Sequence, residues 1–318
     1  MNLFDKRFVV NTGKGGVGKS TLTAAIALAA AKRGQRVLVL ELNTKERISR
    51  YFGKPEVGEE ITRIHDNIWA VNVKPESAMK EYVLMTLRFE TIYKAVFENR
   101  FVSQFLRVIP GLNDLVLIGK AWFHEQEQNK DGTPTWDMVV VDAPATGHGL
   151  FLLQIPKVIV DAVPTGPMAN ECRKILDLLT DPKRTALNLI TLTEEMPVNE
   201  TIELKAKLDK SLQVPMGYLI ANGIFPSVFT PYEAKHLETL RNTANTPANP
   251  RLKALLEAGL FRFERCELQS RYLDQLKRSV SLPIIEVPQY FEPDINLDVL
   301  RRMAAHVEAC VEQQASAA

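Results

Sequence analysis

A glycine-rich loop near the start of the chain constrains its fold more than any other feature. The segment RFVVNTGKGGVGKST places Gly13-x-x-x-x-Gly18-Lys19-Ser20 between an apolar run and an alanine-rich stretch. Glycine permits backbone angles at which several N–H groups turn toward one bound anion, and a side chain would forbid those angles. The pattern therefore predicts a strand, a phosphate-binding loop and a helix in direct succession, which is typical of α/β proteins.

Short apolar runs alternate with helical stretches along the rest of the chain. This alternation is expected of a parallel sheet covered by helices on both faces. The helix after the loop is predicted from Lys19 to about Arg33, with Gly34 as its C-terminal cap. We therefore predict an α/β fold with a doubly wound, mostly parallel sheet. The runs that indicate buried strands are Arg7–Thr12, Arg36–Leu42, Met138–Asp142, Ala186–Thr193, Met216–Asn222 and Leu282–Val287.

A helical block interrupts this alternation. Residues 76 to about 128 carry no strand signal, and apolar residues recur there at helical spacing. The sequence predicts one domain over residues 1–318, with a helical subdomain inserted in it and formed by about 76–135 together with 148–182. The recurring apolar residues are Met85, Phe89, Ile92 and Val96.

The composition argues against several classes of function. The chain has 39 Lys and Arg against 38 Asp and Glu, so it offers no strong positive field to a nucleic acid. No apolar run approaches the roughly 18 residues of a membrane span, and the first residues lack the apolar core of a signal peptide. Cys172, Cys266 and Cys310 form no CxxC pair, which is typical of a reducing compartment. We therefore predict a cytoplasmic protein without a nucleic-acid partner.

The loop also predicts the groups that would hold a nucleotide and its metal ion. Lys19 offers a compact positive charge to the β- and γ-phosphates, and Ser20 offers a hydroxyl ligand to Mg²⁺. Backbone amides at the N-terminus of the following helix supply further donors. The predicted ligand is ATP or ADP with Mg²⁺. The predicted contacts are Gly13, Gly15, Gly16, Val17, Gly18, Lys19, Ser20 and Thr21.

Two other residues are predicted to act in catalysis. Lys14 stands early in the loop, where its ammonium suits the nucleotide of a facing subunit, the alternative being a solvated lysine. Asp142 ends the run MVVVD at the carboxyl edge of a strand, where a carboxylate can hold a water bound to Mg²⁺. The segment Pro144–Gly149 is expected to form a loop rather than the start of a helix.

Three segments, GKGGVGKST, PGLNDLVLIGK and DAPATGHGLFLLQIP, carry a resemblance to a known family. Together they resemble the ArsA-type, anion-transporting ATPases, which include the arsenite-pump ATPase and the tail-anchored-protein targeting ATPase. The resemblance runs from residue 7 to about 295. It implies an ATPase that acts as a homodimer or as a heterodimer with a paralogous subunit, and whose ATP state opens and closes a helical subdomain. By position it implies that Asn222 and Pro288 contact adenine, although Asn222 can alternatively cap a strand end.

The chain departs from the family pattern at three places. Asn43 stands where the family has the switch I aspartate that positions the attacking water, and an amide cannot accept a proton. Slow hydrolysis is therefore expected unless Glu41 or Glu46 substitutes. The zinc-binding CxxC is missing, and Pro164 replaces the metalloid-binding cysteine, so neither zinc nor arsenite is an expected ligand.

Two functions of different classes follow from these observations. The first is a Mg-dependent ATPase whose closure handles an unidentified protein or membrane-associated client. The second is a nucleotide-gated scaffold that barely hydrolyses ATP and regulates or completes a paralogous ATPase subunit, which Asn43 favours. A small-molecule kinase or ligase is a weaker third alternative, because no acceptor-binding motif stands out.

Overall fold

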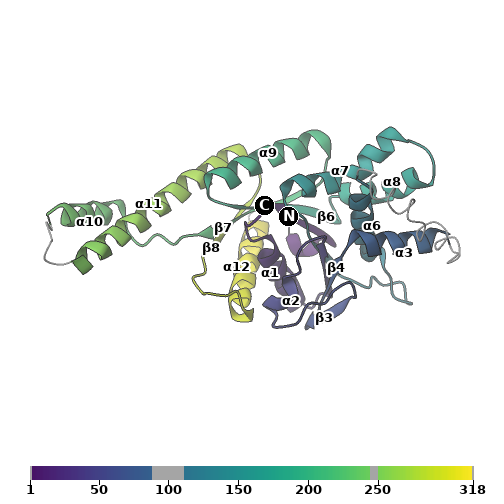
Figure 1. The fold of residues 1–318 in the computed structure, drawn as a ribbon, viewed down its shortest axis with the longest axis horizontal. Helices are drawn as coiled ribbons and strands as arrows, with labels where there is room; N and C mark the ends of the chain where they lie inside the picture. The colour runs from purple at the N-terminus through teal and green to yellow at the C-terminus, as the bar shows by residue number, and fades with distance from the viewer. Residues whose placement is uncertain (1, 88–110, 244–249, 317–318) are drawn as a thin grey trace.

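The computed structural model describes residues 2–87, 111–243 and 250–316, and within them one sheet runs through the molecule (Figure 1). Its strand order is β3-β4-β2-β5-β1-β6-β7-β8. The pair β3–β4 is antiparallel and the other described pairs are parallel. The predicted doubly wound, mostly parallel sheet is therefore confirmed. The strands are β1 Phe8–Gly13, β2 Val37–Leu42, β3 Thr62–His65, β4 Ile68–Val73, β5 Met138–Asp142, β6 Thr185–Leu192, β7 Met216–Ile224 and β8 Ile284–Pro288.

The pair β3–β4 is the part of the sheet that the sequence analysis did not predict. β3 is short and polar, and two of its four residues are exposed, so it carries almost no periodic signal. β4 has the sequence IWAVNV, which is rich in residues that favour strands, and it is almost wholly buried. The six predicted strands are all present, and none of their ends differs from the prediction by more than two residues.

Helices cover the two faces of the sheet in separate layers. α1, α2 and α12 pack on one face, and α6, α7, α8 and α9 pack on the other (Figure 1). The predicted end of α1 is confirmed, because Gly34 has φ +86° and donates its N–H to Ala31 O. The helices are η1 Leu3–Asp5, α1 Lys19–Lys32, α2 Ile48–Tyr51, α3 Pro75–Leu87, α6 Leu112–Gln126, α7 Thr146–Ala162, α8 Pro167–Thr180, α9 Glu195–Ser211, α10 Pro231–Thr243, α11 Pro250–Ser279 and α12 Leu297–Ser316.

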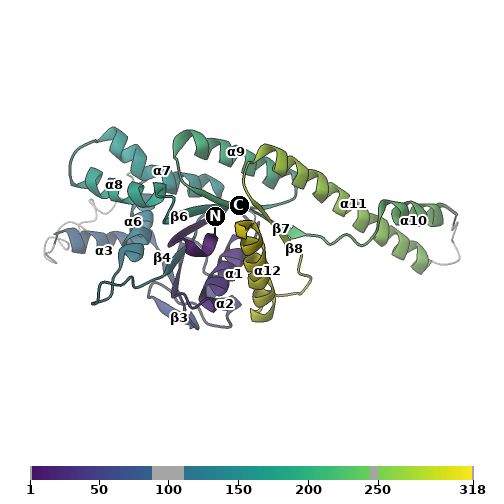
Figure 2. The ribbon, with the colours of Figure 1, turned by 180° about the vertical axis from the view of Figure 1, so that it is seen from behind.

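Helices α10 and α11 pack on each other and project from the sheet as a long arm (Figures 1 and 2). At the opposite end, α3, α6, α7 and α8 match the ranges of the predicted helical subdomain to within two residues. The apolar residues predicted to form helices within 88–110 lie outside the described residues, and the movement of this block as a unit stays a prediction. Among the described helices, none combines the length and the apolar character needed to span a membrane.

The start of α7 corrects one expectation. The helix begins at Thr146, so the loop predicted over Pro144–Gly149 is wrong. Proline and two glycines argue locally against a helix, but packing overrides them. A Cβ on Gly149 would lie 2.7 Å from Thr12 Oγ1 and 2.8 Å from Pro144 O. Glycine is therefore needed there to bring the first turn of α7 against β1.

Candidate functional site

The glycine-rich loop lies between β1 and α1 at the carboxyl edge of the sheet. Gly16 and Gly18 have φ angles of +86° and +92°, in the left-handed region that favours glycine. A Cβ on Gly13 would lie 2.1 Å from Ile190 O, and one on Gly18 would lie 2.3 Å from Asn222 Nδ2. The loop is thus packed against β6 and β7, and α1 begins directly after it without a side-chain cap. The N–H groups of the first helical turn are left as donors for an anion.

Three polar side chains converge at the start of α1. Lys19 Nζ donates to Lys14 O at 2.9 Å, and Ser20 Oγ donates to Asp142 Oδ2 at 2.6 Å. Asp142 is almost fully buried, and this burial raises its pKa to about 6. Burial also lowers the pKa of Lys19, although the charge of Asp142 opposes that effect. Burial therefore disfavours the charged forms of Asp142 and Lys19, and a bound metal ion and phosphate group would stabilise them.

The other predicted loop residues frame this cluster. Gly15 is exposed, whereas Val17 is buried and anchors the loop in the core on the α1 side. The Thr21 hydroxyl donates to the Tyr51 hydroxyl at 3.1 Å. The Thr21 side chain therefore joins the first turn of α1 to α2.

The residues at this site fit a magnesium nucleotide. Hydroxyl and carboxylate oxygens are the ligands that Mg²⁺ prefers. Asp142 Oδ1 is buried, and no described residue donates a hydrogen bond to it. At Gly16, nothing lies within 4 Å of the position of a Cβ, so the crest of the loop is open. Beside it is a cavity of about 430 Å³, lined by the loop and by residues at the start of α9, a volume typical of ligand sites.

Lys14 is engaged within its own chain. Its Nζ lies 2.7 Å from Oε1 of Glu200 on α9, and both side chains are partly exposed. Sequence reasoning did not predict this pair, because nothing in the local pattern around Glu200 points to the loop. The predicted role of Lys14 across a dimer stays a prediction.

The segment after β2 holds the predicted switch I position. Asn43 is exposed and has φ +48°, a left-handed conformation that asparagine tolerates better than most residues. Glu41 is fully buried, and its Oε1 accepts hydrogen bonds from Arg47 N at 2.8 Å and Ile48 N at 3.3 Å. Burial raises the pKa of Glu41 to about 7. The two residues therefore lie in opposite environments although they are close in sequence.

The Glu46 side chain stabilises the loop after β2 and does not face solvent. It is buried, and its Oε1 accepts hydrogen bonds from Ser49 Oγ at 3.2 Å and from Val57 N. Its Oε2 accepts from Gly58 N at 3.1 Å. Both oxygens of Glu46 thus hold the loop that follows β2.

The two residues predicted to contact adenine lie on neighbouring strands. Asn222 is near the end of β7, and its Nδ2 donates to Val17 O at 2.9 Å. Pro288 ends β8 and pairs in register with Ile224 of β7. The Asn222 amide therefore braces the phosphate loop rather than capping its own strand, and the adenine contact stays a prediction.

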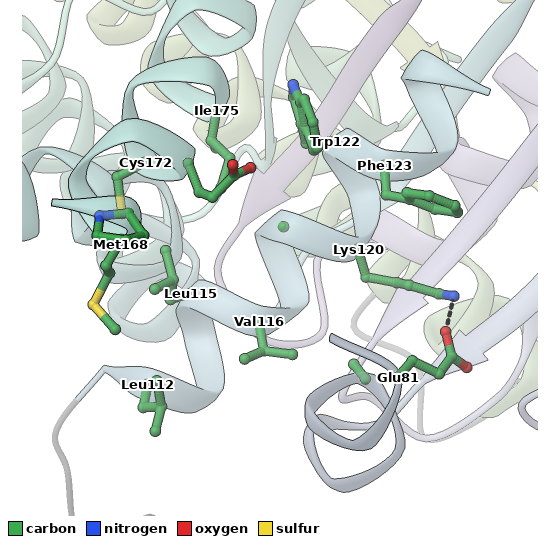
Figure 3. Close-up of a pocket in the computed structure, with 14 residues that line it drawn as sticks. Glu81, Leu112, Leu115, Val116, Lys120, Trp122, Phe123, Met168, Cys172 and Ile175 are labelled. Atoms are coloured by element: carbon green, nitrogen blue, oxygen red, sulfur yellow. Dashed lines mark hydrogen bonds and ion pairs between the residues drawn. The ribbon is translucent and has the colours of Figure 1, made fainter. Parts of the chain in front are cut away.

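A second feature lies between α3, α6 and α8. Apolar side chains line a cavity of about 290 Å³ there, and Lys120 and Glu81 form an ion pair at its edge (Figure 3). Cys172 contributes a thiol to the lining. The other lining residues are Ala78, Leu112, Leu115, Val116, Gly119, Trp122, Phe123, Pro167, Met168, Glu171 and Ile175.

Comparison with known proteins agrees with this geometry. The family described as anion-transporting ATPase matches residues 6–165, half of the chain. The chain is 32% identical to ATPase BagA of Mycobacterium tuberculosis over 227 residues, covering 70% of this chain and 66% of that protein. It is 26% identical over 231 residues to the arsenical pump-driving ATPase of Escherichia coli, covering 68% of this chain and 39% of that protein. The chain thus spans just under two thirds of the length of the mycobacterial relative. On the matched region and the loop within it, this chain belongs to the ArsA-type, anion-transporting ATPase family.

Proposed function

We propose that the chain binds Mg-ATP at the phosphate loop and hydrolyses it slowly to ADP and phosphate, and that its closure acts on a protein or membrane-associated client. The observation that carries the proposal is the convergence of Lys19, Ser20 and Asp142 under the loop at the start of α1. Family membership supports it, because the relatives are named as ATPases.

The roles divide by chemistry. Lys19 would release Lys14 O and place its ammonium on the β- and γ-phosphates, while backbone amides from Gly15 to Thr21 donate to phosphate oxygens. Ser20 Oγ would ligate the metal, and Asp142 would hold one of the metal's waters. Bound Mg²⁺ supplies positive charge that offsets the charge of the phosphates.

Hydrolysis is expected to be slow because the switch I carboxylate is replaced. The Asn43 amide can hydrogen-bond a water but cannot take its proton. Glu46 does not replace it, because both of its oxygens hold the loop after β2. A missing general base costs on the order of 10²–10⁴-fold in rate where such a base is used. The turnover that remains would rest on positioning and charge.

Closure of the dimer would move Lys14 from its own chain to the nucleotide of the facing subunit. To reach the nucleotide of a second copy or a paralogous subunit, Lys14 must first leave Glu200. Ion pairs between partly exposed groups contribute only about 0–1 kcal/mol, so separating Lys14 from Glu200 costs little free energy. The pair would hold Lys14 until a facing nucleotide offers a stronger partner.

The cavity between α3, α6 and α8 would bind the client. α7 starts four residues after Asp142 and reaches this region, where a Cβ on Gly111 would lie 2.3 Å from Ile155 Cδ1 of α7. A shift of α7 at the phosphate site would therefore be passed to the start of α6. The apolar lining suits an apolar segment of a client (Figure 3). Arsenite is not the proposed ligand, since Pro164 stands at the metalloid cysteine position and Cys172 alone provides no soft thiolate cluster.

A single-turnover ATPase assay with and without Mg²⁺ tests the nucleotide part of the proposal. Wild type should bind ATP, and it should release phosphate only when Mg²⁺ is present. Lys19→Ala should bind ATP at least about tenfold more weakly and release no phosphate. Lys183→Ala is the matched control, because this exposed lysine precedes β6 at the opposite edge of the sheet. Equal ATP affinity in wild type and Lys19→Ala would reject the site.

The same assay separates the second candidate function. ATP binding with no phosphate release would identify the nucleotide-gated scaffold, which Asn43 favours, and would reject the hydrolytic proposal.

Thiol labelling tests the client part. In a Cys266→Ser, Cys310→Ser background, a maleimide should label Cys172 faster with a non-hydrolysable Mg-ATP analogue than with Mg-ADP, because Cys172 lines the cavity and is otherwise buried. Equal labelling rates in the two nucleotides would contradict coupling between the phosphate loop and the cavity.

A further inference from the structure

A second buried carboxylate stands beside the phosphate site. Glu41 of β2 and Asp142 of β5 are register partners on adjacent parallel strands. Val39 and Val140, two residues earlier on each strand, both pack in the core on the α1 side of the sheet. Because side chains alternate along a strand, Glu41 and Asp142 also project to the α1 side. The two carboxylates therefore lie next to each other at the edge where α1 begins.

Each of these carboxylates has one oxygen in use and one without a partner. Oε1 of Glu41 accepts from the backbone N–H groups of Arg47 and Ile48, and Oδ2 of Asp142 accepts from Ser20 Oγ. Oε2 of Glu41 and Oδ1 of Asp142 are buried, and neither accepts a direct hydrogen bond from a described residue. Asp142 has a further hydroxyl close by, that of Thr23, which lowers its pKa. A buried carboxylate oxygen is costly unless it accepts a hydrogen bond, so these two oxygens are suited to accept hydrogen bonds from a hydrated metal ion bound between the strands and α1.

The loop after β2 is held at two points, and one of them reaches the phosphate site. Glu46 holds the far part of the loop through Val57 and Gly58, with both of its oxygens engaged. Glu41 holds the near part, at Arg47 and Ile48, and keeps one oxygen free of described partners. The Glu41 side chain thus connects the part of the site where the metal would bind to the loop after β2, which we call the switch loop because it carries Asn43.

We propose that Glu41 is a positioning residue that links the bound magnesium ion to the switch loop. Its Oε2 accepts a hydrogen bond from a water of the ion while its Oε1 holds the Arg47–Ile48 turn. This inference rests on the Mg-ATP site proposed above and adds the element that senses its occupancy. Loading of the metal then stiffens the loop that carries Asn43, and loss of the metal loosens it.

Hydrogen exchange and metal affinity test this role in the full chain. Amide exchange of the segment containing Arg47 and Ile48 is measured with a non-hydrolysable ATP analogue, in Mg²⁺ or in EDTA. Mn²⁺ affinity of the analogue-bound protein is measured by electron paramagnetic resonance. Glu56→Gln is the control, because Glu56 lies in the same loop and forms an exposed ion pair with Arg50.

In wild type and Glu56→Gln, Mg²⁺ should slow exchange at Arg47 and Ile48 beyond the effect of the analogue in EDTA. Glu41→Gln should bind the analogue in EDTA as wild type does, which shows that it is folded. It should lose the Mg²⁺-dependent slowing, and its Mn²⁺ affinity should fall about ten- to a hundredfold, as for other groups that orient metal ligands.

Two results for Glu41→Gln overturn the inference. One is Mg²⁺-dependent slowing and Mn²⁺ affinity equal to those of wild type. The other is loss of analogue binding even in EDTA, which makes Glu41 a folding determinant of the loop. Failure of the wild type itself to bind the analogue rejects the Mg-ATP site, and with it this inference. The two proposals therefore fail in distinguishable ways.

Discussion

Replacing Glu41 by Gln is expected to stabilise the nucleotide-free protein at pH 8 and to change its stability little at pH 5. Burial raises the pKa of the Glu41 carboxyl from 4.5 to about 7. Glutamine has the shape of the protonated carboxyl and keeps an acceptor for the N–H groups of Arg47 and Ile48. The two proteins should therefore differ only where the wild-type carboxyl is ionised.

The sign and size of the effect follow from proton binding. Between pH 4.5 and about 7, the folded wild type retains a proton that the unfolded chain has released, so its free energy of unfolding falls as the pH rises. Each pK unit corresponds to about 1.4 kcal/mol. The pKa difference at Glu41 therefore amounts to about 3 kcal/mol at pH 8. Glu41→Gln removes this cost, so its advantage over wild type should grow from pH 5 to pH 8.

Urea unfolding at pH 5, 6.5 and 8, without nucleotide or divalent cations, measures the effect. Glu46→Gln serves as the comparison, because its carboxylate accepts three hydrogen bonds and its loss should destabilise the protein at all three pH values. A Glu41→Gln protein that is no more stable than wild type at pH 8 would refute the reasoning. So would a stability difference that is the same at every pH.

Further predictions concern the nucleotide and the dimer. Lys19→Ala should weaken ATP binding at least about tenfold, since a hydrogen bond to a charged group is lost, and titration with labelled ATP measures this. Asn43→Asp should raise single-turnover hydrolysis on the order of 10²-fold with little change in ATP affinity, and an unchanged rate would show that the missing carboxylate is not what limits turnover. Lys14→Ala should abolish analogue-induced dimerisation in sedimentation, whereas Glu200→Gln should strengthen it about two- to fivefold by freeing Lys14. If neither substitution changes analogue-induced dimerisation, Lys14 does not contact the nucleotide of the facing subunit.

Local features of the sequence can also mislead when tertiary packing opposes them. Pro144, Gly147 and Gly149 indicated a loop after β5, yet α7 begins at Thr146. The reason is the close approach of the helix to β1, which leaves no room for a Cβ at Gly149. Glycine weakens an isolated helix, but here it permits the contact that fixes α7 to the phosphate site.

The sequence by itself determined the phosphate loop, the strand before it, the helix after it and the buried parallel strands other than β4. These features depend on contiguous residues, on turn glycines and on runs of apolar side chains, so local pattern is sufficient to identify them. Only the tertiary structure decided that Lys14 is held by Glu200, which is 186 positions away, and that Glu46 holds a loop. It also decided that Glu41 lies beside Asp142 on the adjacent strand. Pairing between distant segments follows from sheet order and register, which no local run of residues encodes.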